Sequence, residues 1–534
     1  MKRQLLLACT AVSSLAHAVA DEARNVRPNI IFILCDDLGY GDLSCYGQPF
    51  ISTPCIDRMA KEGVRFTQAY AGAPVSAPSR ATIMTGQHTG HTHVRGNREY
   101  WRDSPTVMYG DNADYAVAGQ EPYDPNHVVL TELMRRRGYA TGVFGKWAGG
   151  YEGSCSTPDK RGVDEFYGYI CQYQAHLYYP NFLNRYSRAK GDTAVVREVL
   201  EDNIRHPMYG NGYERRSQYS ARLIHEKAMQ WLESQDGGQP FFGFFTYTLP
   251  HAELAQPYDS IVRHYESEFV FDKRWGGNEG SRYNPVRRAH AQFAAMVARL
   301  DMYVGEIFDL LRAKGLDKNT VVVFSSDNGP HEEGGADPLF FGRDGKLRGL
   351  KRQCYEGGIR VPFIVWWPGH VAPATESDLQ IAFYDILPTF CDIADMTDGG
   401  AAKAVGRDVD GVAGCRDVQE ADGCSEGHTG RCRDGHADGS VDGLSFLHAL
   451  LGNYEVQPRH DHLYWEFHET DQIAVRMGDW KMVVVKGVPR LYDLAVDIHE
   501  DHDVSGAHPD IVRRLVDIVH REHVDSPLFK VTLP

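Results

Sequence analysis

Apolar, β-branched runs alternate with helical stretches over residues 29–367, and this alternation constrains the fold more than any other feature. Strands are predicted at 29–34, 64–66, 141–144, 241–248, 320–324 and 361–367, and helices at 56–61, 130–137, 219–234 and 289–314. Such alternation is typical of a parallel sheet covered by helices. We therefore expect an α/β fold with a large mixed, mostly parallel sheet sandwiched by helices.

The C-terminal part has a different pattern. Four short strands are predicted at 463–465, 472–477, 480–485 and 490–492, followed by an amphipathic helix at 510–522. Close spacing of this kind favours an antiparallel meander. We expect a main domain over 21–398 and a smaller α+β subdomain, with an antiparallel sheet, over 442–534.

Residues 399–441 separate the two predicted units. They contain ten glycines, eight acidic residues and no aromatic residue. A stretch of this composition buries too little surface to offset the entropy of ordering it. We interpret it as a flexible surface insert.

Charge and the N-terminus indicate the class of protein. The formal net charge of −16 argues against a nucleic acid or an anionic membrane as partner, because both require a basic face. Lys2 and Arg3 precede an apolar stretch over 5–15 and the small-x-small sequence Ala16-His17-Ala18. This pattern predicts a signal peptide over 1–20 and a periplasmic or secreted protein. No internal apolar run is long enough to span a membrane.

Four predicted strands are followed by residues that can take part in chemistry. Asp36 and Asp37 follow the strand at 29–34, Lys146 the strand at 141–144, His251 the strand at 241–248, and Asp327 with Asn328 the strand at 320–324. Ligands bind at the carboxyl ends of the strands in open parallel sheets. The four strands therefore predict one shared site.

The acidic members of this set predict a metal site. Asp36, Asp37, Asp327 and the amide oxygen of Asn328 form an oxygen-only ligand set, which suits a hard cation such as Ca²⁺ or Mg²⁺. Capping of turns is the alternative for each residue taken singly.

Ser76 lies just before a proline that can open a helix, and Arg80 lies one turn further on. Backbone N–H groups and the helix dipole favour an anion at such a position. The arrangement suits a nucleophile that attacks a bound anion, and a serine N-cap beside an exposed arginine is the alternative.

The run Ser76-x-Pro78-Ser79-Arg80, followed by Thr85-Gly86, resembles the signature of the type I, formylglycine-dependent sulfatases. Similar motifs recur over nearly the whole mature chain outside the insert. They are Asp36-Asp37-Leu-Gly-Tyr-Gly-Asp42, Gly145-Lys146-Trp147, Pro250-His251, Ser326-Asp327-Asn328-Gly329-Pro330, Tyr355-Glu356-Gly357-Gly358, Met477-Gly478-Asp479-Trp480-Lys481 and Leu491-Tyr492-Asp493-Leu494.

The resemblance implies a fold like that of the alkaline phosphatase superfamily and a mechanism of sulfate ester hydrolysis. A maturase would oxidise residue 76 to formylglycine, whose hydrate would attack sulfur to give a covalent sulfo-enzyme. The implied metal ligands of Ca²⁺ (or Mg²⁺) are Asp36, Asp37, Ser76, Asp327 and Asn328. The other implied catalytic residues are Arg80 for the hydrate, Lys146 and Lys351 for the sulfuryl oxygens, and His251 as the acid that protonates the leaving group.

The chain departs from the family at one catalytic position. The family usually has Gly-Lys-x-His, and this chain has Gly145-Lys146-Trp147-Ala148. We hypothesise that His176 replaces the missing base, and a structural histidine is the alternative. Serine at position 76 resembles the substrate of oxygen-independent maturases, which are bacterial.

Residues around the site are candidates for substrate binding, with a core or loop role as the alternative for each. They are Arg95, Asn97, Tyr178, Tyr179, Trp465, Glu466 and His468. We expect a sulfated carbohydrate, with galactose or N-acetylgalactosamine as the sugar. The rival hypotheses are a phosphodiesterase or phosphonate hydrolase of the same superfamily, and a decayed sulfatase that only binds sulfated glycans.

Overall fold

The computed structural model describes residues 27–101, 117–205, 213–277, 283–342, 345, 347–396 and 441–534. The predicted signal peptide, and all of the predicted insert except Val441, lie outside these residues. A ten-stranded sheet forms the centre, in the order β15-β2-β14-β13-β1-β12-β6-β7-β8-β9. In that order the strands are Thr375–Ser377, Val64–Phe66, Phe363–Trp366, Thr320–Ser326, Asn29–Cys35, Phe241–Thr246, Ala140–Lys146, Glu165–Tyr169, Phe182–Ser187 and Val196–Val199.

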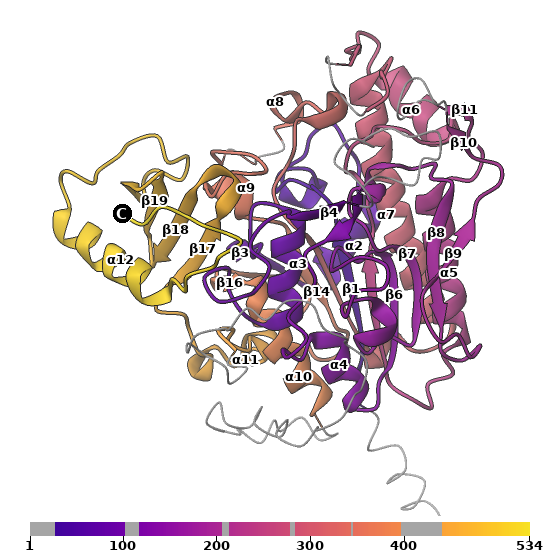
Figure 1. The fold of residues 1–534 in the computed structure, drawn as a ribbon, viewed down its shortest axis with the longest axis horizontal. Helices are drawn as coiled ribbons and strands as arrows, with labels where there is room; N and C mark the ends of the chain where they lie inside the picture. The colour runs from indigo at the N-terminus through magenta and orange to yellow at the C-terminus, as the bar shows by residue number, and fades with distance from the viewer. Residues whose placement is uncertain are drawn as a thin grey trace, which may run out of the picture.

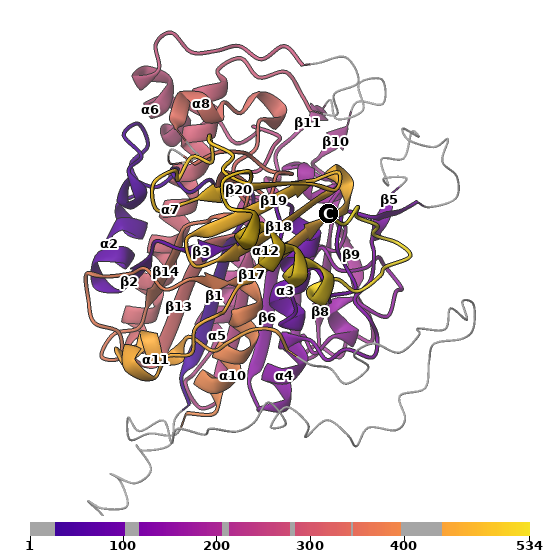
Figure 2. The same ribbon diagram turned by 90° about the vertical axis from the view of Figure 1, so that its left-hand side faces the viewer.

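The middle of the sheet is parallel, from β13 through β1, β12 and β6 to β7. Strands β14 and β8 run antiparallel to these neighbours. The expected large mixed, mostly parallel sheet is confirmed, and helices lie on both of its faces (Figures 1 and 2).

Alternate residues of β1 show why its sequence is apolar from Ile30 to Cys35. Ile31 and Ile33 pack with α2 (Pro54–Glu62), α5 (Ser220–Ser234) and α7 (Ala289–Ala313) on one face. Ile30 and Phe32 pack with α3 (Ser76–Thr85), α4 (Leu130–Arg136) and α10 (Ile386–Ala394) on the other. Side chains of a strand alternate between faces, so a strand covered on both sides is apolar throughout.

The C-terminal unit is a four-stranded antiparallel sheet, as expected, with the order β17-β18-β19-β20. Its strands are Leu463–Phe467, Gln472–Met477, Trp480–Val485 and Val488–Asp493. Helix α12 (Pro509–Glu522) buries Leu515, Ile518 and Val519 against one face of this sheet. The other face packs on the main domain (Figure 1).

The remaining elements are short. They are α6 (Ser260–Glu268), α8 (Pro338–Phe341), α9 (Glu356–Ile359), α11 (Leu447–Leu450), and the strand pairs β3 with β16 (Ala69–Tyr70, Ile381–Ala382), β4 with β5 (Glu99–Trp101, Val117–Gln120) and β10 with β11 (Ile204–Arg205, Tyr213–Arg215). Within the described residues, no helix has the length and apolar character that crossing a membrane requires.

A buried ion cluster joins the two units. Lys481 Nζ of β19 lies 2.9 Å from Glu356 Oε1 of α9 and 3.0 Å from Glu500 Oε1. All three side chains are inaccessible to solvent. The C-terminal sheet is therefore held against the main domain by charge as well as by apolar packing.

Candidate active site

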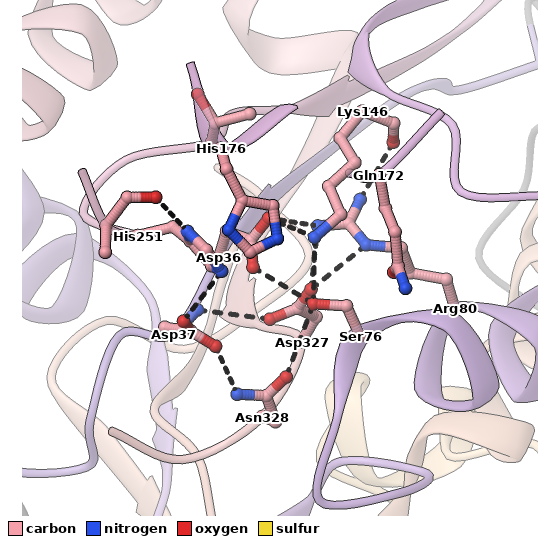
Figure 3. A network of polar contacts seen from close by, with 12 residues as sticks. Asp36, Asp37, Ser76, Arg80, Lys146, Gln172, His176, His251, Asp327 and Asn328 are labelled. Atoms are coloured by element: carbon pink, nitrogen blue, oxygen red, sulfur yellow. Dashed lines mark hydrogen bonds and ion pairs between the residues drawn. The ribbon is translucent and has the colours of Figure 1, made fainter. Parts of the chain in front are cut away.

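Four neighbouring strands deliver the polar residues of the site. In the order β13, β1, β12 and β6 they are all parallel, so their carboxyl ends lie at one edge of the sheet. Asp36 and Asp37 follow β1, Asp327 and Asn328 follow β13, Lys146 ends β6, and His251 lies beyond β12. The structure thus brings these side chains together, as Figure 3 shows.

Helix α3 brings Ser76 to the same place. Ser76 is the first residue of the helix, and its hydroxyl donates to Asp36 Oδ1 at 3.0 Å. Lys146 Nζ donates to Ser76 Oγ at 3.0 Å, and Asn328 Oδ1 lies 3.5 Å from the same hydroxyl oxygen. The nucleophile candidate is therefore held between a carboxylate and an ammonium group.

Three cations face the three carboxylates. Arg80 donates from Nε and Nη2 to Asp327 Oδ2 at 3.0 and 2.8 Å. Lys146 Nζ lies 2.6 Å from Asp36 Oδ2. Lys351 Nζ lies 2.9 Å from Asp37 Oδ2. Each of these side chains is almost fully buried, so the ion pairs are little screened by solvent.

The pairing outweighs burial for two of the carboxylates. Burial alone would raise the pKa of Asp36, but Lys146 and His251 hold it below its ordinary value. Burial would also raise the pKa of Asp37, and Lys351 and His251 hold it far below its ordinary value. Both groups are therefore ionised and able to bind a cation.

His251 lies beside the Lys351–Asp37 pair. Its Nε2 is 3.2 Å from Asp37 Oδ2 and 3.1 Å from Lys351 Nζ, and its Nδ1 contacts Ala252 O. Burial lowers the pKa of His251, although Asp37 opposes the shift. The His251 ring meets the ring of His176 edge-on, with centroids 4.3 Å apart.

Position 148, where the family usually has histidine, has an unusual backbone conformation in this chain. Ala148 is buried with a φ of 57°, in the left-handed region, and its methyl group cannot accept a proton. His176 ends a short 3₁₀ turn, Gln174–His176, and approaches the site through its contact with His251 (Figure 3). An imidazole thus lies next to the catalytic candidates even though position 148 supplies none.

Most of the substrate-binding candidates have structural partners. The Tyr178 hydroxyl donates to the carbonyls of Thr248 and His251, at 2.8 and 3.0 Å, and its ring is fully buried. Trp465 is also fully buried, and its Nε1 donates to Ala71 O at 2.8 Å. Tyr179 is buried against the ring of Tyr219. The burial of these rings favours the core role that the sequence analysis gave as the alternative for each of them.

Arg95 and Glu466 pair with each other. Arg95 Nη1 lies 3.4 Å from Glu466 Oε2, and both side chains are buried. Glu466 also accepts a hydrogen bond from Tyr464, at 2.7 Å. His468 Nδ1 lies 2.7 Å from Lys530 O. Arg95 and Glu466 therefore help to join the main domain to the C-terminal sheet.

Asn97 lies next to a residue that sequence reasoning missed. Its Oδ1 accepts a hydrogen bond from Gln172 Nε2 at 2.9 Å, and Gln172 appears among the site residues in Figure 3. Tyr283 and Glu333, which contact His176 and Lys351, were also missed. Gln172 lies in the same short segment as His176, so the sequence could have indicated it as a site residue. Tyr283 and Glu333 belong to no recognised motif, and no sequence pattern indicated them.

The donor set fits a hard divalent cation. Carboxylate oxygens of Asp36 and Asp37, the amide oxygen of Asn328 and the hydroxyl of Ser76 lie close together, with no sulfur among them. Asp327 adjoins the set, since its Oδ1 accepts from the backbone N–H of Asp37 at 3.2 Å. Oxygen-only sites of this type suit Ca²⁺ or Mg²⁺.

Comparison with known proteins identifies the family. The Sulfatase family model matches residues 28–396. An N-acetylgalactosamine-6-O-sulfatase of Bacteroides thetaiotaomicron is 26% identical, with 92% of each chain covered.

Two solved structures share the fold. The crystal structure of Ps i-CgsB superposes with a TM-score of 0.65 at 24% identity, covering 93% of this chain and 92% of that one. The phosphonate monoester hydrolase of Agrobacterium radiobacter gives 0.57 at 19%, covering 93% and 96%.

The likeness to these two structures shows a shared fold class, a large mixed sheet with helices on both faces. Within that class the chain belongs to the sulfatase family, and it is a sulfuric ester hydrolase.

Proposed function

We propose that this sulfatase removes O-sulfate from a carbohydrate, using formylglycine made from Ser76 and a bound Ca²⁺ or Mg²⁺. The observation that carries the proposal is the position of Ser76, whose hydroxyl contacts Asp36 and Lys146 inside a set of three buried carboxylate–cation pairs. Buried charge at the carboxyl ends of parallel strands, around a serine at a helix N-terminus, favours a site that acts on an anion.

The metal would be held by the oxygens of Asp36, Asp37, Asp327, Asn328 and residue 76. When bound, the metal and the hydrated formylglycine would supply an activated oxygen nucleophile and charge stabilisation for the sulfate group. This set of residues is consistent with the covalent sulfo-enzyme that the family resemblance implies.

The protein's own side chains have separate roles. Arg80 would fix residue 76 and Asp327 in place through its buried guanidinium. Lys146 and Lys351 would neutralise charge on the oxygens of the sulfate group. His251, adjoining Lys351, would donate a proton to the departing alkoxide.

His176 is proposed as the base that replaces the histidine absent at Ala148. The contact between its ring and that of His251, the proposed acid, supports this role. A His176→Ala variant should lose about a hundredfold or more in kcat, as is usual when a general base is removed. Full turnover by this variant would exclude the role.

The proposed substrate is a sulfated glycan, with galactose or N-acetylgalactosamine carrying the sulfate. The Bacteroides thetaiotaomicron relative is an N-acetylgalactosamine-6-O-sulfatase, which supports N-acetylgalactosamine as the sugar. Asn97 is the substrate-binding candidate that the contact with Gln172 favours, and His468 is the other one that we retain.

Two further proposals concern maturation and location. A serine at position 76 favours an oxygen-independent maturase as a partner. The N-terminal sequence, with Lys2 and Arg3 before an apolar stretch, supports export to the periplasm or beyond.

Peptide mass spectrometry across Ser76 tests the proposal, on protein produced together with an oxygen-independent maturase. We expect loss of two hydrogens at Ser76, accompanied by release of free sulfate from sulfated N-acetylgalactosamine or galactose. Ser76→Ala, produced in the same way, is the control and should show neither. Unmodified serine in the presence of an active maturase would count against the formylglycine mechanism.

The rival hypothesis, a phosphodiesterase or phosphonate hydrolase, can be tested directly. It is worth testing because a phosphonate monoester hydrolase shares the fold. A panel of nitrophenyl sulfate, phosphate and phosphonate separates the two activities. We expect the sulfate ester to have the highest kcat/KM, and preferred hydrolysis of the phosphonate would favour the alternative. A decayed sulfatase would bind sulfated glycans and release no sulfate.

A further inference from the structure

His176 is the first member of a series of hydrogen-bonded side chains to which the proposed function assigns no role. Its Nδ1 lies 2.6 Å from the hydroxyl of Tyr283, and the two rings are stacked with centroids 5.7 Å apart. The same hydroxyl lies 2.7 Å from Glu333 Oε2. An imidazole, a phenol and a carboxylate therefore form a continuous chain that begins beside His251.

The direction of these hydrogen bonds follows from the charge on Glu333. Arg352 Nη1 lies 2.6 Å from Glu333 Oε1, and Lys351 Nζ lies 3.9 Å from Glu333 Oε2. Burial would raise the pKa of Glu333, but these cations hold it far below its ordinary value. Glu333 is therefore ionised, and an ionised carboxylate only accepts hydrogen bonds.

The hydroxyl of Tyr283 must then donate to Glu333, which leaves its oxygen to accept from His176. The acceptor role of Tyr283 requires the proton of the neutral imidazole to be on Nδ1. In that tautomer the lone pair is on Nε2.

We propose that Tyr283 and Glu333 are positioning residues that hold His176 as the Nδ1–H tautomer and so present Nε2 as a proton acceptor. The use of that acceptor in sulfate release rests on the proposed function. A proton that Nε2 would take from the remaining hydroxyl of residue 76 converts the ring to imidazolium, whose Nδ1–H already faces Tyr283 and, through it, the negative charge of Glu333. The bound proton returns to water before the next turnover.

The same residues do not favour a second metal ion. His176, His251 and Glu333 have nitrogen and oxygen atoms close enough to share one. The ammonium group of Lys351 already lies 3.1 Å from His251 Nε2 and 3.9 Å from Glu333. A cation of the protein itself is thus in contact with two of the three groups.

Titratable groups from several segments lie around His176, and among them Glu253 donates its backbone N–H to His176 O at 3.3 Å. Tyr173, His251 and Tyr283 contact the His176 ring, and Glu333 acts on it through Tyr283. Removing the charge of Glu333 should lower the pKa of the His176 imidazolium, because a negative charge nearby favours the protonated ring.

The first test reads the tautomer directly and does not depend on maturation or metal. Long-range ¹H–¹⁵N spectra of ¹⁵N-histidine-labelled protein, carrying unmodified Ser76, distinguish a protonated Nδ1 from a protonated Nε2. The His176 signals are those missing in His176→Gln. We expect the Nδ1–H tautomer in the parent protein and a mixture in Tyr283→Phe.

Tyr258→Phe is the matched control, because Tyr258 also donates to a glutamate, Glu266, at 2.9 Å, but on the exposed surface. It should leave the His176 signals unchanged. An Nε2–H tautomer in the parent protein, or an unaltered tautomer in Tyr283→Phe, would overturn the proposal.

The second test uses the matured enzyme. Tyr283→Phe and Glu333→Gln should each lower kcat about tenfold, and Glu333→Gln should shift the acidic limb of the kcat–pH profile to lower pH. In a His176→Ala background neither change should lower kcat further, because positioning residues act through the residue they hold. Additive losses in that background would overturn the proposal. Absence of sulfate release by the parent enzyme would instead refute the proposed function and leave the tautomer result standing.

Discussion

Lys481 offers a sharp test of how the C-terminal sheet is held to the main domain. Its ammonium group lies within 3.0 Å of both Glu356 and Glu500, and none of the three side chains is exposed. Lys481→Met keeps an unbranched side chain, one heavy atom shorter, and removes the charge. The two buried carboxylates then face each other without their shared cation.

The expected cost follows from the partners that remain. Removing one member of a buried ion pair typically costs 3–5 kcal/mol. Glu356 Oε2 keeps Arg360 at 3.3 Å and Arg476 at 3.9 Å, so its charge stays partly compensated. Glu500 can take up a proton, since burial and Glu356 raise its pKa to about 7. We therefore expect a loss at the lower end, about 3 kcal/mol.

Urea unfolding followed by tryptophan fluorescence measures this loss as a fall in the midpoint at constant slope. Lys530→Met, an exposed lysine of the same unit, is the control and should change stability by less than about 0.5 kcal/mol. At pH 8, Lys481→Met combined with Glu500→Gln should be more stable than Lys481→Met alone. A Lys481→Met protein within about 1 kcal/mol of the parent would refute the argument.

Two other predictions concern Glu500 and Arg80. The pKa of Glu500 is raised from 4.5 to about 7, so the folded state binds this proton more tightly and the contribution of this carboxyl to stability falls as pH rises from 4.5 to 7. Glu500→Gln should flatten the stability–pH curve over that interval, measured by urea unfolding at several pH values, and an unchanged slope would contradict the assignment. Arg80→Lys replaces two hydrogen bonds to Asp327 by one at most, and should lower kcat/KM about a hundredfold with the fold retained by circular dichroism. Activity within tenfold of the parent would show that the paired contact is dispensable.

The main sheet and its edge could be predicted because their signals are local. A strand buried on both faces needs a continuous apolar run, and 30–34 and 321–324 are such runs. Each run leads directly to its polar residues, so the parallel arrangement alone places them at one edge. Local sequence was enough to predict that Asp36 and Asp327 would meet.

The candidates for substrate contact show which features of the site a sequence pattern does not reveal. Arg95 and Glu466 are 371 positions apart, and no local pattern reveals that they pair. Tyr178 and Trp465 are residue types that often bind sugars. The same residue types also fill protein cores when their one polar atom donates a hydrogen bond to a backbone carbonyl, as it does in both of these. Tyr283 contacts His176 and Glu333, and these residues come from distant segments, which the sequence does not reveal.

The charge of the site leads to a final prediction about metal removal. Asp36, Asp37 and Asp327 carry three negative charges, and Arg80, Lys146 and Lys351 carry three positive ones. The sum is zero, so without a further cation the buried site offers an anion no net attraction. A divalent ion raises the sum to two positive charges, which complements a singly charged sulfate ester.

Chelation should therefore weaken binding of a sulfated sugar as well as turnover. Isothermal titration of the sulfated ligand into Ser76→Ala protein separates the two effects, because this variant cannot turn over. We expect Kd to rise at least tenfold when EDTA replaces Ca²⁺, and Lys351→Met, which also removes one positive charge, to weaken binding with Ca²⁺ present. Equal affinity with and without the cation would show that the carboxylates of this site are neutralised by the protein's own lysines and arginine alone, and that the bound metal acts on the reaction and not on recognition of the anion.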